Sequence, residues 1–269
     1  MNEHAKRWIT GLIGTPLVIG FVLYSSNLLF ALLIILLIQL SIKEFNRLVF
    51  TPEQYREKMV VVFFSLLLSV VIITENFILI SLALQLIVFL SFIFFLLTIR
   101  EGEIHLERLG KMVLGVFYLP FSLSFLVCLR TLPQGIKWVF LVLVIIFCGD
   151  TVAFYVGKLW GKHKLIPIVS PNKTVEGAIG YIIGCFLGGL VFYEITFQEL
   201  SFSHLTILCI AGAILGQLGD LCESALKRAA GVKNAGSLFP GHGGILDRID
   251  SLIFFVPFVF YYHYFFIDK

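Results

Sequence analysis

The stretch NFILISLALQLIVFLSFIFFLLTI, residues 76–99, runs for 24 positions without a charged residue. A helix needs about 20 apolar residues to cross the hydrocarbon core of a bilayer, so this stretch is long enough to do so. Its apolar residues follow one another without alternating with polar ones, which argues against a strand of a membrane β-barrel. We therefore expect a membrane-spanning helix here.

Apolar runs of this kind recur along all 269 residues. The chain is 59% hydrophobic and 14% charged, whereas a soluble domain usually carries about 25% charged residues. We expect an all-α, polytopic integral membrane protein, with a first helix that is not removed as a signal peptide. The runs predict nine helices, near 9–25, 27–42, 59–74, 76–99, 111–129, 137–157, 176–195, 203–222 and 250–267.

The distribution of basic residues tests this count. With the N-terminus inside, nine helices place 17 of the 20 Lys and Arg residues in inner segments, and only Arg130, Lys137 and Lys269 remain outside. Cytoplasmic loops of membrane proteins are enriched in Lys and Arg, so we expect a cytoplasmic N-terminus. The net charge of +3 is too small to indicate a nucleic-acid partner.

The two halves of the chain differ in their chemistry. Residues 1–140 contain no Asp, and all five Asp follow, at positions 150, 220, 247, 250 and 268. Neither an internal repeat nor a low-complexity linker is visible. We expect a single membrane domain over 1–269, in which 1–135 is mainly scaffold and 136–269 supplies the catalytic helices and cytoplasmic loops.

The first polar stretch is CGDTVAFYVGKLWGK, residues 148–162, and it continues to SPNKTVEG, residues 170–177. Asp150 falls inside an apolar helix, where a lone carboxylate costs a few kcal/mol. We expect it to face a polar cavity, with an ion pair to a nearby Lys or a hydrogen bond between packed helices as the alternative. Lys173 lies in what we expect to be a compact turn that opens the next helix. The free N–H groups of a helix start, together with one Lys, suit a phosphate.

The second polar stretch is GDLCESALKR, residues 219–228. On a helix, Asp220, Ser224, Lys227 and Arg228 share one face, because they are spaced by four, seven and eight positions. Glu223 is expected to point away from this face or to balance Lys227.

The third polar stretch is PGHGGILDRIDS, residues 240–251. Asp247 and Asp250 are three positions apart and share a face at the start of the last helix. Before them, Gly243 and Gly244 allow the backbone to turn its N–H groups toward an anion. His242 either donates a hydrogen bond to that anion or only holds the turn.

Carboxylates from two helices, Asp220 and Asp247, offer the oxygen ligands that a hard divalent cation prefers. Phosphoryl and nucleotidyl transfer need such a cation and basic side chains to neutralise the phosphates. The arrangement therefore predicts a nucleotidyl- or phosphoryl-transfer site, and a charge network that only caps helices is the alternative.

The motifs SALKR (224–228) and PGHGGILDRID (240–250) resemble the signature of the phosphatidate cytidylyltransferases, also called CDP-diacylglycerol synthases. The runs GKHKL (161–165) and SPNKTVEG are similar to that family as well, whereas the first half resembles it only in hydropathy and topology. The resemblance implies that CTP and phosphatidic acid react, with Mg²⁺, to give CDP-diacylglycerol and pyrophosphate. One departure is Asn234, where the family usually has Asp.

The resemblance also implies roles for particular residues. Asp220 and Asp247 would hold Mg²⁺, with a second metal ion left open. The phosphates would be bound by Lys173, Lys227, Arg228 and Arg248, and Asp150 and Asp250 would support the polar cavity. The expected setting is the bacterial inner membrane among membrane lipids, with the site on the cytoplasmic side. The oligomeric state stays open, with a homodimer among the options.

Three other functions compete with this one. A related CTP-dependent enzyme could act on another lipid phosphate or a polyprenol. A CDP-alcohol phosphotransferase would show a dense Asp-Gly-x-x-Ala-Arg run, which this sequence lacks. An ion-coupled transporter would be expected to show repeats and midplane sites on broken helices, whereas the charges here gather near predicted helix ends.

Overall fold

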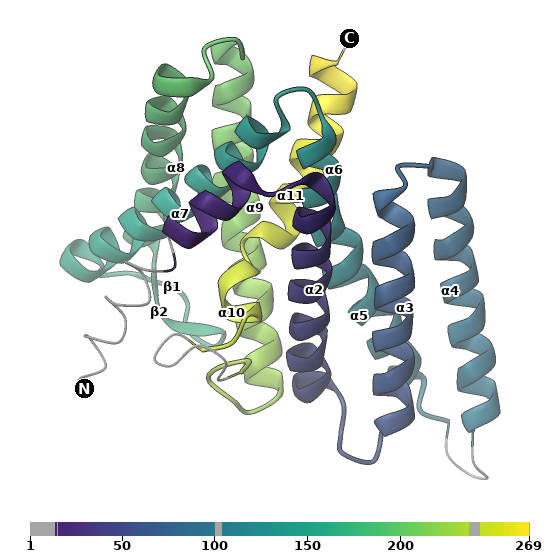
Figure 1. Ribbon diagram of the computed structural model, residues 1–269. Helices are drawn as coiled ribbons and strands as arrows, with labels where there is room; N and C mark the ends of the chain where they lie inside the picture. Colours follow the sequence, from purple (N-terminus) through teal and green to yellow (C-terminus); the bar gives the residue numbers. More distant parts are fainter. Residues whose placement is uncertain (1–13, 15, 100–103, 237–242, 269) are drawn as a thin grey trace. The chain divides into compact units, whose positions relative to one another are not determined.

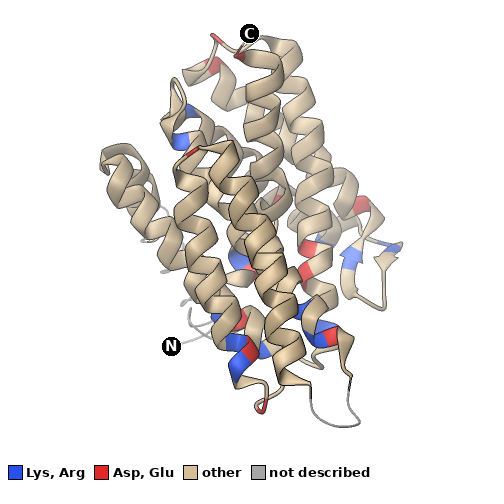
Figure 2. Ribbon diagram, turned by 90° about the vertical axis from the view of Figure 1, so that its right-hand side faces the viewer, with Lys and Arg blue, Asp and Glu red and all other residues tan. Residues whose placement is uncertain are grey.

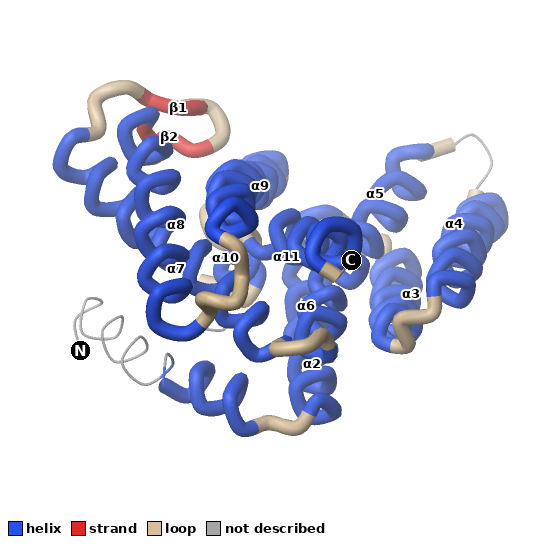
Figure 3. The backbone as a smooth tube through the Cα atoms, turned by 90° about the horizontal axis from the view of Figure 1, so that it is seen from above, coloured by secondary structure: helices blue, strands red, loops and turns tan. Residues whose placement is uncertain are grey.

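The computed structural model describes residues 14, 16–99, 104–236 and 243–268. Most of these residues are helical (Figures 1 and 3), which confirms the all-α, polytopic class. The strands in this part of the chain are β1 (Lys164–Ile166) and β2 (Ser170–Thr174), which pair antiparallel. The prediction of a compact turn at 170–174 is wrong, because this stretch is an extended strand that pairs with β1.

Six helices in the described ranges are long and apolar enough to cross a membrane. They are α2 (Asn27–Val49), α4 (Phe77–Thr98), the continuous helix of α5 (Leu106–Val116), η1 (Phe117–Phe121) and α6 (Ser122–Thr131), then α7 (Gly135–Trp160), α8 (Val175–Thr196) and α9 (Phe202–Ala229). The remaining elements are α3 (Tyr55–Ile73), the short α10 (Leu246–Ile249), and the apolar α11 (Leu252–Tyr262) with η2 (His263–Ile267).

The count of nine spans and the side of the N-terminus stay predictions. The first predicted helix, 9–25, lies largely outside the described residues, although 16–24 are helical. The helix α3 carries Arg56, Glu57 and Lys58 in its first turn, so its apolar part is shorter than the helix itself.

Polar side chains mark where several of these helices begin. The hydroxyl of Ser26 accepts a hydrogen bond from the backbone of α2, and Ser201 does the same for α9. The side-chain oxygen of Asn76 accepts two backbone N–H groups of α4, at 3.0 and 3.2 Å. Such caps satisfy N–H groups that have no partner inside the helix, so they set the starting points of the apolar runs.

Large apolar side chains are exposed along several of the helices. Leu97 is 81% exposed, Ile78 79% and Ile195 75%. Figure 2 shows long helical stretches without a charged residue. In water such surfaces would favour aggregation, whereas in a bilayer the lipid tails cover them. The exposure therefore fits an integral membrane protein.

The chain forms two compact units, one of Met1–Cys128 with Asn234–Leu246, and one of Leu129–Lys233 with Asp247–Lys269. In the first unit, α3 packs against α2, α4 and α5, and α2, α3 and α4 run side by side (Figure 1). In the second, α8 packs against α7 and α9, and α11 packs against α7 and α9. The segment 234–246 thus groups with the N-terminal helices. The expectation of a single membrane domain with a scaffold half and a catalytic half stays a prediction.

The closest packing in the second unit lies between α7 and α8. One face of α8 carries glycines at three- or four-residue spacing, and they meet α7 at backbone or side-chain atoms: Gly177, Gly180, Gly184 and Gly188. A Cβ at Gly184 would lie 2.5 Å from the backbone oxygen of Cys148. Because lipid gives helices no hydrophobic reason to associate, small residues that permit close approach drive their packing.

We expect Gly184→Ala to destabilise the protein, because the added methyl meets backbone that cannot rotate away. Overpacking of this kind costs about 1–3 kcal/mol. Gly110→Ala is the matched control, since nothing lies within 4 Å of a Cβ there and Ala favours a helix over Gly by about 1 kcal/mol. Thermal unfolding in detergent micelles should show a lower midpoint for Gly184→Ala alone. Equal midpoints would contradict the packing described for α7 and α8.

Candidate functional site

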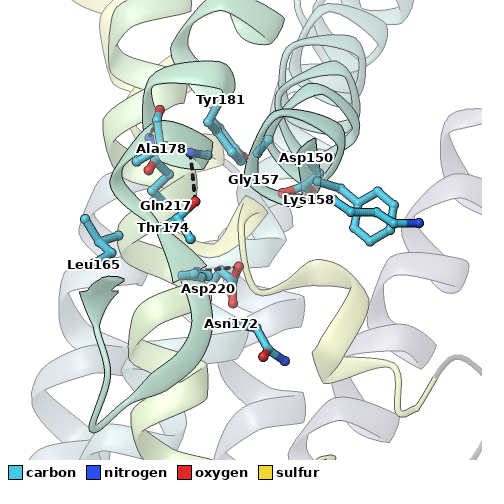
Figure 4. Close-up of a pocket in the computed structure, with 14 residues that line it drawn as sticks. Asp150, Gly157, Lys158, Leu165, Asn172, Thr174, Ala178, Tyr181, Gln217 and Asp220 are labelled. Atoms are coloured by element: carbon cyan, nitrogen blue, oxygen red, sulfur yellow. Dashed lines mark hydrogen bonds and ion pairs between the residues drawn. The ribbon is translucent and has the colours of Figure 1, made fainter. Parts of the chain in front are cut away.

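A pocket of about 460 Å³ opens among α7, α8, α9 and the β1–β2 hairpin of the second unit. Asp150 from α7, Lys173 from β2 and Asp220 from α9 line it together with Tyr181 and Gln217 (Figure 4). The three charged residues come from separate parts of the sequence. Asp150 therefore faces a polar pocket, as expected for a carboxylate inside an apolar helix.

The hairpin places Lys173 at this pocket. Thr174 ends β2, and its hydroxyl accepts the backbone N–H of Gly177 at 3.1 Å, which caps α8. Glu176 in the first turn of α8 accepts the backbone N–H groups of Lys162 and His163, at 3.1 and 3.2 Å. Both ends of the hairpin are thus tied to the start of α8. The ammonium of Lys173 lies 2.5 Å from a carboxylate oxygen of Asp220.

Three carboxylates gather next to this ion pair. Oxygen atoms of Asp220, Glu223 and Asp250 all lie within 4.8 Å of one another. The hydroxyl of Ser224 donates to the other carboxylate oxygen of Asp220, at 3.3 Å. The shared face predicted for Asp220 and Ser224 is confirmed by this hydrogen bond. Glu223 was expected to point away from this face or to balance Lys227; the second alternative is confirmed by its ion pair with Lys227, and Glu223 also lies within the carboxylate cluster.

Glu223 also contacts Lys227, one turn further along α9. The ammonium of Lys227 lies 2.7 Å from Asp247 as well, so it bridges two carboxylates. Both Lys227 and Asp247 have side chains that are only 12% exposed. The structure thus connects Asp247 to the cluster through Lys227. The role of Asp247 as a metal ligand stays a prediction.

Asp250 is 8% exposed and lies in the turn before α11, whereas Glu223 is fully buried at 0% exposure. The carboxylate of Asp250 accepts the backbone N–H of Ser251 at 2.7 Å. Burial raises the pKa of Asp250 well above its usual range, and the nearby carboxylates of Asp220 and Glu223 raise it further. A cation bound among them would oppose that rise, because it favours the ionised form of each carboxylate.

The two predicted phosphate-binding arginines are both exposed. The guanidinium of Arg228 donates to the backbone oxygens of Val169 and Val232, at 3.1 and 3.0 Å. It therefore ties the turn of the hairpin to the end of α9. Arg248 lies on α10. Phosphate binding by either residue stays a prediction.

The glycine-rich segment before α10 belongs to the first unit. Gly243 has a left-handed backbone with φ +82°, a conformation that favours glycine. Gly244 is buried against the carboxylate of Glu44, a residue of α2. The anion that this described part of the segment faces is thus a side chain of the protein itself. His242 lies outside the described residues, and substrate binding by Gly243 and Gly244 stays a prediction.

The cluster suits a hard divalent cation. Its donors are carboxylate oxygens close enough to share one ion, and magnesium prefers such ligands along with phosphate oxygens and water. The carboxylates also outnumber the lysines paired with them. Asp220, Glu223 and Asp250 could therefore hold Mg²⁺.

Two carboxylates were not predicted as functional residues. Glu223 follows Asp220 by three positions on a helix, and that spacing could have placed it in the cluster. No local feature of the sequence pointed to Glu44.

Taken together, the fold and the site define a polytopic helical membrane protein with a carboxylate-rich, lysine-containing polar pocket. The chain belongs to the cytidylyltransferase family, whose model matches residues 5–266.

Among curated proteins, the chain is similar to the phosphatidate cytidylyltransferase of Bacillus subtilis strain 168, with 39% identity over 156 residues, 58% of either chain. It is also similar to the phosphatidate cytidylyltransferases of Staphylococcus epidermidis strain RP62A and Staphylococcus aureus strain COL. Both are 41% identical, over 51% of this chain and 52% of the relative. The matched stretch thus spans little more than half the length of these relatives.

We expect the cluster to bind a divalent cation in the absence of any nucleotide. Loss of even an outer partner of a metal site costs about 10- to 100-fold in affinity, so Asp220→Asn or Asp250→Asn should weaken binding at least that much. Titration of the purified protein with Mn²⁺, followed by electron paramagnetic resonance, measures this.

Glu199→Gln is the control for this titration. Glu199 is a 59% exposed carboxylate that pairs with Lys137 at 3.0 Å, outside the cluster. Its substitution should leave Mn²⁺ binding unchanged. Binding by Asp250→Asn as tight as that of the wild type would remove Asp250 from the metal site.

Proposed function

We propose that the protein transfers the cytidylyl group of CTP to phosphatidic acid, which yields CDP-diacylglycerol and pyrophosphate for phospholipid synthesis. The observation that carries this proposal is the meeting of Asp220, Glu223 and Asp250 beside Lys173 and Lys227. Membership of the cytidylyltransferase family and the printed names of the relatives support the choice of substrates.

The reaction needs no nucleophile from the protein. A phosphate oxygen of phosphatidic acid attacks the α-phosphorus of CTP, and the bond from that phosphorus to the bridging oxygen of pyrophosphate breaks. In such reactions, catalysis consists of positioning and of stabilising charge on the phosphoryl oxygens. Bound Mg²⁺ supplies a Lewis acid that holds and neutralises phosphate oxygens.

The chain's own residues divide this task by charge. Asp220, Glu223 and Asp250 would hold the cation, and Asp247 would be available as a further oxygen ligand if Lys227 paired with phosphate instead. Lys173 and Lys227 would bind the triphosphate, whose oxygens are comparable partners to the carboxylates that they contact in the structure. Ser224 keeps the carboxylate of Asp220 in place through its hydrogen bond. Asp150 and Tyr181 complete the wall of the pocket.

The setting follows from the substrates. Phosphatidic acid lies in the bilayer and CTP is dissolved in the cytosol, so the pocket should open at the cytoplasmic face of the bacterial inner membrane. The expected excess of Lys and Arg on that side supports this orientation.

We expect Asp220→Ala and Asp247→Ala to abolish transfer for practical purposes, lowering kcat by at least about 100- to 1,000-fold, the scale seen when one electrostatic group of a catalytic site is removed. The assay uses purified protein in micelles, phosphatidic acid and CTP labelled at the α-phosphorus, with label counted in the lipid extract. Glu199→Gln serves as the control with full activity. Wild-type rates for either Asp variant, or full activity in excess chelator, would refute the site.

The same assay separates the main alternative. Another lipid phosphate, such as a polyprenyl phosphate, takes the place of phosphatidic acid in a parallel reaction. Label in the polyprenyl lipid alone would replace the proposed acceptor, and label in neither lipid would overturn the cytidylyltransfer itself.

Asn234 allows a separate test. It is exposed and keeps a carbonyl oxygen while lacking the charge that the family's usual Asp would bring. If that charge assists the reaction, Asn234→Asp should raise kcat/KM for CTP severalfold, and Asn234→Ser is the uncharged control. An unchanged rate in both variants would show that the position does not contribute to transfer.

A further inference from the structure

Glu44 is a buried carboxylate in the first unit. It lies in α2 and is only 6% exposed. Burial of a carboxylate is costly unless hydrogen bonds or charges compensate. One compensating group is the backbone N–H of Leu246, which donates to Oε2 of Glu44 at 2.9 Å. The two residues are 202 positions apart in the sequence.

Two glycines that precede Leu246 in the sequence, Gly236 and Gly244, also lie against this carboxylate. A Cβ added at Gly236 or at Gly244 would overlap the carboxylate group of Glu44. The two glycines lie near opposite ends of the segment 234–246, which clusters with the unit that contains α2. Only residues without a side chain allow the backbone to come this close, so Gly236 and Gly244 both pack directly on the Glu44 carboxylate.

The hydrogen bond also caps a helix. Leu246 is the first residue of α10, and the first N–H groups of a helix have no partner within it. A side chain just before the helix usually supplies the acceptor. Here the acceptor comes from α2. Asp247 and Arg248 follow Leu246 directly, so the direction of the backbone at Leu246 decides where both side chains start.

We propose that Glu44 is a positioning residue for the transfer reaction: by capping α10 at Leu246 it sets the backbone from which Asp247 and Arg248 project. This inference rests on the proposed function for its catalytic part. Asp247 pairs with Lys227 at 2.7 Å, and a displacement of about 1 Å at a reacting centre can lower a rate about 100-fold. Glu44 touches neither substrate nor metal in this role.

The first experiment compares Glu44→Ala with Glu57→Ala. Glu57 is a matched control, since it too is a 6% exposed glutamate of the first unit, and it pairs with Arg108, at 3.8 Å. We expect Glu44→Ala to lower kcat for CTP by about 100-fold, with a smaller change in KM, while folded Glu57→Ala keeps its kcat. Equal kcat in the two variants would overturn the proposal.

A double-mutant cycle tests whether the effect passes through the contact with the segment. In the wild-type background, Gly236→Ala forces a methyl group onto the Glu44 carboxylate and should lower kcat. In the Glu44→Ala background that space is open, so the same change should add little. Fully additive losses would show that the two residues act independently and would contradict the proposal.

Hydrogen exchange gives a readout that does not depend on activity. Mass spectrometry of the peptide that covers 243–250 should show faster exchange at the Leu246 amide in Glu44→Ala and unchanged exchange in Glu57→Ala. If Glu44→Ala exchanges faster but the wild-type protein transfers no cytidylyl group, the inferred cap is supported and only the proposed function is refuted. Unchanged exchange in Glu44→Ala would refute the cap, whatever the activity.

Discussion

The site depends on the repulsion among carboxylates that the fold holds together. Asp220, Glu223 and Asp250 place oxygens within 4.8 Å of one another, with Glu223 fully buried and Asp250 only 8% exposed. Like charges at such distances destabilise one another unless a cation lies among them. Lys173 and Lys227 supply part of that positive charge. The remaining negative charge is what makes the cluster suited to a divalent cation and, through it, to phosphates.

Close helix packing makes this arrangement rigid. The glycine-bearing face of α8 lies against α7, and the same helix is capped by Thr174 at the end of the hairpin. Lys173 therefore starts from a backbone fixed by two independent contacts. Arg228 adds a third, through its hydrogen bond to the turn of the hairpin. A catalytic group held in this way loses little freedom when a substrate binds.

The N-terminal half is more than a hydrophobic support. Its α2 contributes Glu44, and the segment 234–246 groups with that half although it lies between α9 and α10 in sequence. Gly236 and Gly244 pack against the buried Glu44 carboxylate, and the backbone N–H of Leu246 donates to it. Gly244 of the glycine-rich motif therefore has a structural role, because its lack of a side chain admits the Glu44 carboxylate.

The sequence by itself determined the membrane class, most of the helix positions and the residue types of the site, because apolar runs and buried charges are local signals that lipid makes unambiguous. Asp150 at a pocket followed from the cost of a lone carboxylate in an apolar helix, and Ser224 on the face of Asp220 followed from helical spacing. Only the tertiary structure decided which carboxylates share one cluster. Glu223 joined Asp220 and Asp250, Asp247 paired with Lys227, and Glu44 met Leu246 from 202 positions away. Helical spacing predicts which residues share a face, whereas the packing of several helices decides what that face meets.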